Sequence, residues 1–344
     1  MAFRKRTVFI VGAGASVDLD FDTGPKLLKT IGQMLDYRYD RYTRTSGDGE
    51  IEQIFRALCA NLPHSELEAH ISCARRLSIA AAAETAKSID NAIDQNDDDP
   101  RIALIGKLAI AKAILEQESK SKLKSKKDGS DLSVSDGHAT WLHALGVALV
   151  SDVQKSRVGN IFDNVKIITF NYDRSLERYL PTFLAAAYGM DISECERLVN
   201  ELEIIHPYGT VGKLPWQSTD LISVNYGGPS RSKLLEISGN ILTFTESCHK
   251  DISNRVHNAM SWAQQLVFLG FGYHRQNMRL LSPPERIEPD HVFGTAFGLS
   301  PSAKRAARHS IAELVFELHL QATETLEDQK CYEFLRDFEA ELTS

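Results

Sequence analysis

Two short segments of the chain carry residue types that could bind a nucleotide and act on it. The first is the glycine-rich turn Gly12–Ser16, with the sequence GAGAS, which directly follows the apolar run Thr7–Val11. Glycines in such a turn let the backbone N–H groups approach a pyrophosphate, and the hydroxyl of Ser16 can add a contact. The turn therefore predicts a phosphate-bearing ligand at the end of the first strand.

This glycine pattern is incomplete for a hydride-transferring enzyme. Val17 stands where the dinucleotide-binding fingerprint has its third glycine. That fingerprint also wants an acidic residue about 20 residues further on, after a second strand, and no clear one is found there. Dinucleotide binding is favoured and dehydrogenase chemistry is not. The alternative is a tight strand-to-helix turn that binds nothing.

The second segment places polar side chains at the end of another apolar strand. Val165–Thr169 reads as that strand, and Asn171 and Asp173 follow it. Open parallel sheets bind their ligands at the carboxyl ends of their strands. We therefore expect both side chains at a ligand site. The alternative is that one of them only caps the helix that begins near Ser175.

Strands that alternate with helices must position these residues. Apolar runs predict strands at Thr7–Val11, Val165–Thr169, Glu203–His206, Leu234–Ile237, Leu266–Leu269 and Val292–Thr295, and helical patterns at Ser175–Tyr188, Ser193–Asn200 and Ile252–Gln265. This order is typical of an α/β protein with a Rossmann-like parallel sheet and helices on both faces.

A mainly helical insertion interrupts that pattern. We expect residues 45–136 to form it, and residues 1–44 and 137–344 to form the core, with a helical, amphipathic tail over Ala303–Leu342. The lysine- and serine-rich segment near 119–130 is too polar to bury and predicts a mobile loop, either a solvated linker or a docking site for a partner.

Composition excludes several classes of protein. The 344 residues carry a formal net charge of −7, which argues against direct nucleic-acid binding. No run is apolar enough to span a membrane. The cysteines, Cys59, Cys73, Cys195, Cys248 and Cys331, form no Cys-x-x-Cys pair. We therefore expect buried thiols, no metal, and a reducing cytoplasm.

Beyond these properties, the two segments together resemble the sirtuin-like family. Its members pair a Gly-Ala-Gly-x-Ser loop with a Thr-x-Asn-x-Asp segment, here Gly12–Ser16 and Thr169–Asp173. The resemblance extends more loosely to Ile205–Gly212, IHPYGTVG, and to Leu266–Met278, LVFLGFGYHRQNM. It covers the α/β core and not the helical insertion.

The resemblance implies cleavage of the bond between nicotinamide and ribose in NAD. By it, Asn171 would hold the ribose or the attacking water, Asp173 would bind the carboxamide, and His206 would be the general base. Breaking this bond leaves an oxocarbenium-like centre, which a neutral histidine can help water to attack. At the position where the family has its histidine, this chain has Tyr208. Which of His206 and Tyr208 occupies the base position therefore stays open. The alternative for His206 is that it is a buried core residue without a catalytic role.

The resemblance also implies the contacts to NAD. The residues expected to bind it are Gly12, Ala13, Gly14, Ser16, Thr169, Tyr208, Gly270, Gly272 and Asn277. For the late glycines, a plain strand-to-helix turn is the alternative.

Among sirtuin-like proteins, the bacterial branch that hydrolyses NAD outright is the best match. The zinc ribbon with which the family's deacylases build their acyl-peptide groove is missing. The resemblance thus implies an antiphage NAD hydrolase with NAD as its substrate. Such proteins often work as homo-oligomers or with a HerA-type translocase or an Argonaute-like partner. Two alternatives are a protein deacylase or ADP-ribosyltransferase, and a non-catalytic NAD-binding subunit.

Overall fold

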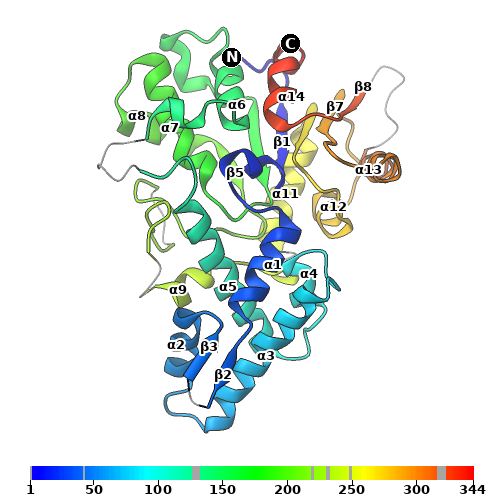
Figure 1. Cartoon of the computed structure of the whole chain (residues 1–344). Helices are drawn as coiled ribbons and strands as arrows, with labels where there is room; N and C mark the ends of the chain where they lie inside the picture. The colour runs from blue at the N-terminus through cyan, green and yellow to red at the C-terminus, as the bar shows by residue number, and fades with distance from the viewer. Residues whose placement is uncertain are drawn as a thin grey trace.

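Short apolar runs rich in β-branched residues form one parallel sheet (Figure 1). The computed structural model describes residues 2–41, 43–125, 132–217, 221–229, 233–247, 250–315 and 323–344. Within these residues the sheet has six strands in the order β5-β4-β1-β6-β7-β8, and all neighbours pair in parallel. The strands are β1 (Thr7–Val11), β4 (Val165–Thr169), β5 (Glu203–Ile205), β6 (Gln265–Leu269), β7 (His291–Thr295) and β8 (Thr323–Glu327).

The two faces of the sheet carry separate apolar cores, because successive side chains of a strand point to opposite faces. In β1, Val8 and Ile10 join one core while Phe9 and Val11 join the other, and all four are at most 1% exposed. Burial on both faces explains why this strand is uniformly apolar rather than alternating.

Helices cover both faces, as predicted for a Rossmann-like α/β fold. One face packs against α6 (Trp141–Val150), α7 (Ser175–Tyr188), α8 (Ile192–Glu201), α14 (Cys331–Asp337) and α15 (Glu339–Thr343). The other packs against α1 (Gly24–Met34), α11 (Lys250–Trp262), α12 (Arg275–Leu281) and α13 (Pro301–Leu314).

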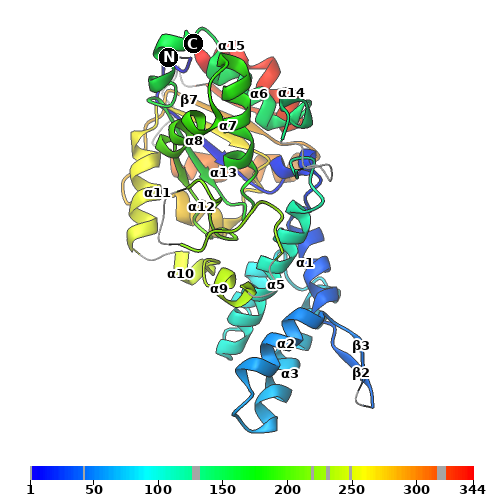
Figure 2. The same ribbon diagram turned by 90° about the vertical axis from the view of Figure 1, so that its left-hand side faces the viewer.

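The predicted insertion folds into helices that pack beside the sheet and extend away from it (Figures 1 and 2). They are α2 (Gly49–Leu58), α3 (His64–Ala82), α4 (Ile89–Asp94) and α5 (Pro100–Glu118). The side chains of Asp48, Ser88 and Asp99 accept hydrogen bonds from the first turns of α2, α4 and α5, which explains where these helices begin.

Helix α5 lies at the centre of the helical lobe that α2, α3, α4 and α5 form. It is buried around most of its circumference because α1, α3, α4 and α9 (Leu234–Ser238) pack against it. Helix α1, from the predicted core segment, also contacts α3 and α4, so the lobe and the core share that helix. The division of the chain at residues 45 and 136 stays a prediction.

Three details differ from the predicted elements. The run Leu234–Ile237 is not a strand but helix α9, which packs on α5 away from the sheet; a short apolar run fits either state. The tail is not helical throughout, because it contains β8, which pairs with β7 and forms the edge of the sheet. A hairpin of β2 (Arg38–Asp40) and β3 (Thr43–Ser46) precedes α2.

The polar segment after α5 is partly buried rather than solvated. Leu123 is 0% exposed and Ser121 is 5% exposed, while the Lys122 ammonium donates to the carbonyl of Asp18 at 2.7 Å. One apolar side chain thus anchors the start of the segment that was predicted to be mobile. Its remainder, residues 126–131, lies outside the described residues.

Four cysteines, Cys59, Cys73, Cys195 and Cys331, are buried free thiols, as predicted, and Cys248 lies outside the described residues. No helix in the described ranges is both long and apolar enough to cross a membrane.

Candidate functional site

The candidate site lies at the carboxyl ends of β1, β4 and β6. The chain builds β4 and β5 on one side of β1 and β6, β7 and β8 on the other, so the strand order reverses beside β1. Open α/β sheets bind ligands in the crevice at such a switch point.

A pocket of about 810 Å³ occupies this position. Most of the predicted site residues line it, namely Gly12, Ala13, Gly14, Ser16, Asn171, Asp173, Tyr208, Gly270, Gly272 and Asn277. Thr169 and His206 are not among its lining residues. Two segments that lie far apart in the sequence complete its walls: residues 87–91 of the insertion, and the α13 residues Ala303, Ala306, Ala307 and Ser310.

The turn after β1 needs glycine at two positions because it packs closely against the turn after β6. A Cβ atom at Gly12 or Gly14 would lie 2.7 or 2.8 Å from the carbonyl oxygen of Gly270, which follows β6. The N–H of Gly12 donates to Leu269 O and that of Gly14 to Gly270 O, both at 2.9 Å. The turns after β1 and β6 thus pack backbone to backbone.

This packing corrects the expected role of the backbone amides. The amides of Gly12 and Gly14 donate to the β6 turn, and those of Ala15 and Ser16 donate to Gly12 O and Ala13 O. These four groups are therefore already hydrogen-bonded within the protein. Within the turn, the N–H of Ala13 makes no hydrogen bond to the described residues, so a pyrophosphate in the pocket would need donors beyond this turn as well.

Gly270 gives a direct test of the close approach. Its φ is +56°, and a Cβ there would lie 2.0 Å from the amide nitrogen of Ala15. We expect Gly270→Ala to destabilise the protein by about 2–3 kcal/mol through backbone strain and steric overlap. The matched control is Gly298→Ala, because Gly298 has φ +71° with nothing within 4 Å of the added atom; it should cost only about 1 kcal/mol. Equal losses in Tm would contradict the packing argument.

Ser16, Asn171 and Asp173 form one hydrogen-bonded group in the pocket wall. The Ser16 hydroxyl donates to Asp173 Oδ2 at 3.0 Å and accepts from Asn171 Nδ2 at 2.8 Å. Asn171 Nδ2 also donates to Gly12 O at 3.2 Å. The two segments singled out in the sequence are thereby joined.

Asp173 both lines the pocket and supports helix α7. Its Oδ1 accepts from the N–H of Ser175, the first residue of α7, at 3.0 Å, while the N-cap of this helix is Arg174 rather than Asn171 or Asp173. Burial raises the pKa of the Asp173 carboxyl, although the hydrogen bonds from Ser175 and Ser16 act in the opposite direction.

One polar atom of this group has no partner. Asn171 Oδ1 is buried and accepts no hydrogen bond from the described residues, while the amide nitrogen of the same side chain makes two. A buried acceptor without a donor is costly. A ligand hydroxyl or a water molecule would satisfy this atom.

His206 lies behind the pocket wall, in a buried pair with Glu177. Its Nε2 is 3.0 Å from Glu177 Oε1 and its Nδ1 is 3.1 Å from the carbonyl oxygen of Asn171. Its side chain is only 6% exposed. Burial acts to raise the pKa of Glu177, but the charge and hydrogen bond of His206 together with the charge of Lys213 place that pKa below its ordinary value. Both ring nitrogens are thus engaged within the protein.

Tyr208 is the residue that the β5 side presents to the pocket. Its hydroxyl donates to Asn277 Oδ1 at 2.8 Å, and its ring packs edge-on against Phe170 at 5.7 Å between centroids. Thr169, the other predicted residue outside the lining, uses its hydroxyl oxygen to accept from the N–H of Asn171.

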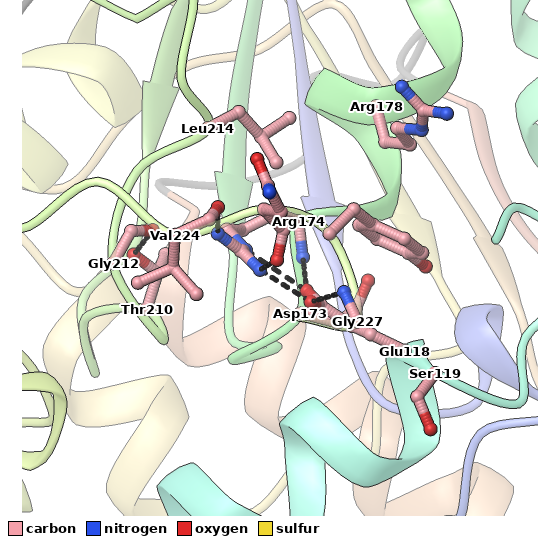
Figure 3. Close-up of polar contacts among 12 residues, drawn as sticks. Glu118, Ser119, Asp173, Arg174, Arg178, Thr210, Gly212, Leu214, Val224 and Gly227 are labelled. Atoms are coloured by element: carbon pink, nitrogen blue, oxygen red, sulfur yellow. Dashed lines mark hydrogen bonds and ion pairs between the residues drawn. The ribbon is translucent and has the colours of Figure 1, made fainter. Parts of the chain in front are cut away.

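A buried ion pair fixes the residue after Asp173 (Figure 3). Arg174 and Glu118, the last residue of α5, are both 0% exposed. Nε of Arg174 donates to Glu118 Oε1 at 3.0 Å, and Nη2 donates to Glu118 Oε2. Arg174 also donates to the carbonyls of Val224 and Asn225, and Glu118 accepts from the N–H of Gly227. The insertion is thereby bonded to the loop that carries Asp173.

No sequence pattern predicts this pair, nor the pocket residues of the insertion and α13. Glu118 and Arg174 lie 56 positions apart and share no motif. Residues 87–91 span the start of α4 and have no spacing that marks a site.

The described residues hold no group of three or more His, Cys, Asp or Glu side chains placed to bind a metal ion.

No family model matches the chain, and no curated protein matches it. A solved structure described as a Sir2 homologue in complex with NAD is similar to it, at 10% sequence identity and a TM-score of 0.40. The match covers 98% of this chain and 90% of that chain. The Rossmann-like fold itself follows from the strand order and the parallel pairing given above.

Proposed function

We propose that this chain binds NAD in the switch-point pocket and hydrolyses it to nicotinamide and ADP-ribose. The observation that carries the proposal is the group of Ser16, Asn171 and Asp173, which unites two motifs in one pocket. The pocket volume of about 810 Å³ lies within the range of sites that enclose small organic ligands, about 300–1,000 Å³.

In the proposed reaction, water attacks C1′ of the nicotinamide ribose. The bond from C1′ to the pyridinium nitrogen breaks, its electron pair leaves with neutral nicotinamide, and the attacking water releases one proton to solvent water. The transition state resembles an oxocarbenium ion. We assign Asn171 Oδ1, the unpartnered acceptor, to hold the water or a ribose hydroxyl. Asp173 would bind the carboxamide.

For His206 the proposal is a positioning role. Its Nδ1 contacts the carbonyl of Asn171 and its Nε2 contacts Glu177, so it holds the Asn171 backbone rather than facing the pocket. Tyr208, in the slot before Gly209, lines the pocket instead. Cleavage through an oxocarbenium-like transition state with a neutral leaving group does not require a strong base. The reaction is therefore compatible with a His206 ring that does not face the pocket.

The biological role proposed is NAD depletion in antiphage defence. It rests on the sequence resemblance, as do the cytoplasmic location, a homo-oligomeric assembly and a HerA-type or Argonaute-like partner. Infection of cells that carry the wild-type gene should lower cellular NAD, and cells that carry Asn171→Ala should keep it. Equal NAD levels in both would contradict the role.

A second candidate is an NAD-binding subunit without turnover. Tyr208 in the histidine slot and the engaged ring of His206 favour it. A deacylase or ADP-ribosyltransferase would instead leave O-acyl-ADP-ribose or a modified protein.

Product analysis separates these functions. The purified chain, alone and with its partner, is incubated with NAD and the products are resolved by chromatography. Hydrolysis predicts equal amounts of nicotinamide and free ADP-ribose. Calorimetric binding of NAD without products would favour the second candidate.

Filling the pocket tests whether NAD binds there. Ala306 is exposed on α13 and lines the pocket, so Ala306→Trp should place a ring in it. We expect the affinity for NAD to fall by about tenfold or more, which corresponds to roughly 1.4 kcal/mol per tenfold step. Ser302→Trp is the matched control, because Ser302 is exposed on the same helix but does not line the pocket. Equal calorimetric affinities in the two variants would contradict the assignment.

A further inference from the structure

Three cationic or protonatable side chains lie on one side of the pocket. Lys87 comes from the connection between α3 and α4 in the insertion, and His274 and Arg275 begin α12 just after the β6 turn. The two segments are neighbours, because Gln276 Nε2 donates to Asp94 Oδ2 of α4 at 3.4 Å. The charge of Lys87 also reaches the His274 ring, whose pKa is lowered first by burial and then by this charge.

Neither Lys87 nor Arg275 pairs with an acidic side chain in the described part of the chain. Among the described residues, neither side chain makes an ion pair or a hydrogen bond, although both are exposed pocket residues. Other cations beside the site are paired: Lys26 with Asp22 at 2.7 Å, and Arg174 with Glu118.

The carboxyl groups of the pocket are all occupied by other partners. Asp22 is bound by Lys26 and Thr30. Asp90 accepts from the Tyr172 hydroxyl, and burial raises the pKa of its carboxyl. Asp173 accepts from Ser16 and Ser175. Lys87 and Arg275 are therefore pocket cations that no carboxylate of the pocket pairs with among the described residues.

These two cations matter because most backbone amides of the glycine turn are not free to bind an anion. The amides of Gly12, Gly14, Ala15 and Ser16 are hydrogen-bonded inside the protein. A diphosphate held in this pocket would bring two negative charges next to a turn in which four of the N–H groups are already used. Charged side chains form the strongest hydrogen bonds to phosphate oxygens.

We propose that Lys87 and Arg275, together with the neighbouring His274, form the subsite that binds the diphosphate of a nucleotide in this pocket. The inference rests on the proposed function, since it concerns the same pocket, and it gives the insertion a direct part in ligand binding. Lys87 is the insertion's contribution, so the core alone would hold an incomplete site.

The test compares the full-length protein with four variants by calorimetry. The probes are ADP-ribose, which carries a diphosphate, and adenosine, which carries none. Lys87→Ala and Arg275→Ala remove the proposed contacts. Lys29→Ala and Arg279→Ala are matched controls, because both residues are exposed on α1 and α12 but do not line the pocket.

We expect each of the first two variants to lose about tenfold in affinity for ADP-ribose, as for one charge-assisted hydrogen bond. Adenosine binding should stay unchanged, and the controls should match the wild type. All four residues are exposed, so Tm should not move. Equal affinity for ADP-ribose in all variants, or no binding of it by the wild type, would overturn the inference.

The outcome is separable from that of the hydrolase proposal. If ADP-ribose binding depends on Lys87 and Arg275 while NAD is never cleaved, the subsite stands and the hydrolase proposal fails. If NAD is cleaved while both variants bind ADP-ribose like the wild type, the reverse holds.

Discussion

Glu118→Ala is expected to destabilise the protein by about 3–5 kcal/mol, the usual cost of removing one partner of a buried ion pair. The change leaves the Arg174 guanidinium charged, 0% exposed and without its carboxylate. It also removes the acceptor of the N–H of Gly227. Because the pair joins α5 to the loop that carries Asp173, we expect the variant to lose binding of NAD as well.

Chemical denaturation followed by tryptophan fluorescence measures this loss. Glu116→Ala is the matched control: Glu116 lies on the same helix and pairs with Lys112 at 3.1 Å, but its side chain is 41% exposed. Exposed pairs contribute at most about 1 kcal/mol. A similar midpoint shift in both variants would show that the buried pair does not hold the lobe to the core.

Strands that are buried on both faces could be predicted from the sequence, and edge elements could not. Thr7–Val11 and Val165–Thr169 are rich in apolar β-branched residues, with Lys166 as the charged exception, and they form β1 and β4 with the predicted bounds. β8 has the sequence TETLE and lies at the sheet edge, where polar residues are tolerated and the apolar signal is weak. Leu234–Ile237 is apolar because it packs on α5 rather than in the sheet.

The residues of the candidate site that lie in the two sequence motifs could be predicted. Ser16, Asn171 and Asp173 follow two strands that pair in the sheet, so their meeting follows from the fold. Lys87 and Glu118 reach the site through the packing of the insertion, and no local pattern encodes that packing. The placement of His206 depends on Glu177, one helix away, so its sequence neighbours did not reveal that its ring is engaged.

Asn171→Ala is expected to lower the rate of NAD hydrolysis by about 10²–10³-fold, as for removal of a positioned polar group in a transition state. The change removes Oδ1, the acceptor without a partner, together with the bonds to Ser16 and Gly12. Asn164→Ala is the matched control. Asn164 also donates to two backbone groups, Phe3 O and Arg4 O, but it lies at the opposite end of β4.

The most direct test of the account is nicotinamide release at saturating NAD by the wild type, Asn171→Ala and Asn164→Ala. The account predicts equal amounts of nicotinamide and ADP-ribose from the wild type and from Asn164→Ala. Asn171→Ala should remain folded, with little or no product. Release from Asn171→Ala at the wild-type rate would contradict the account, and so would NAD binding by the wild type with no release of nicotinamide.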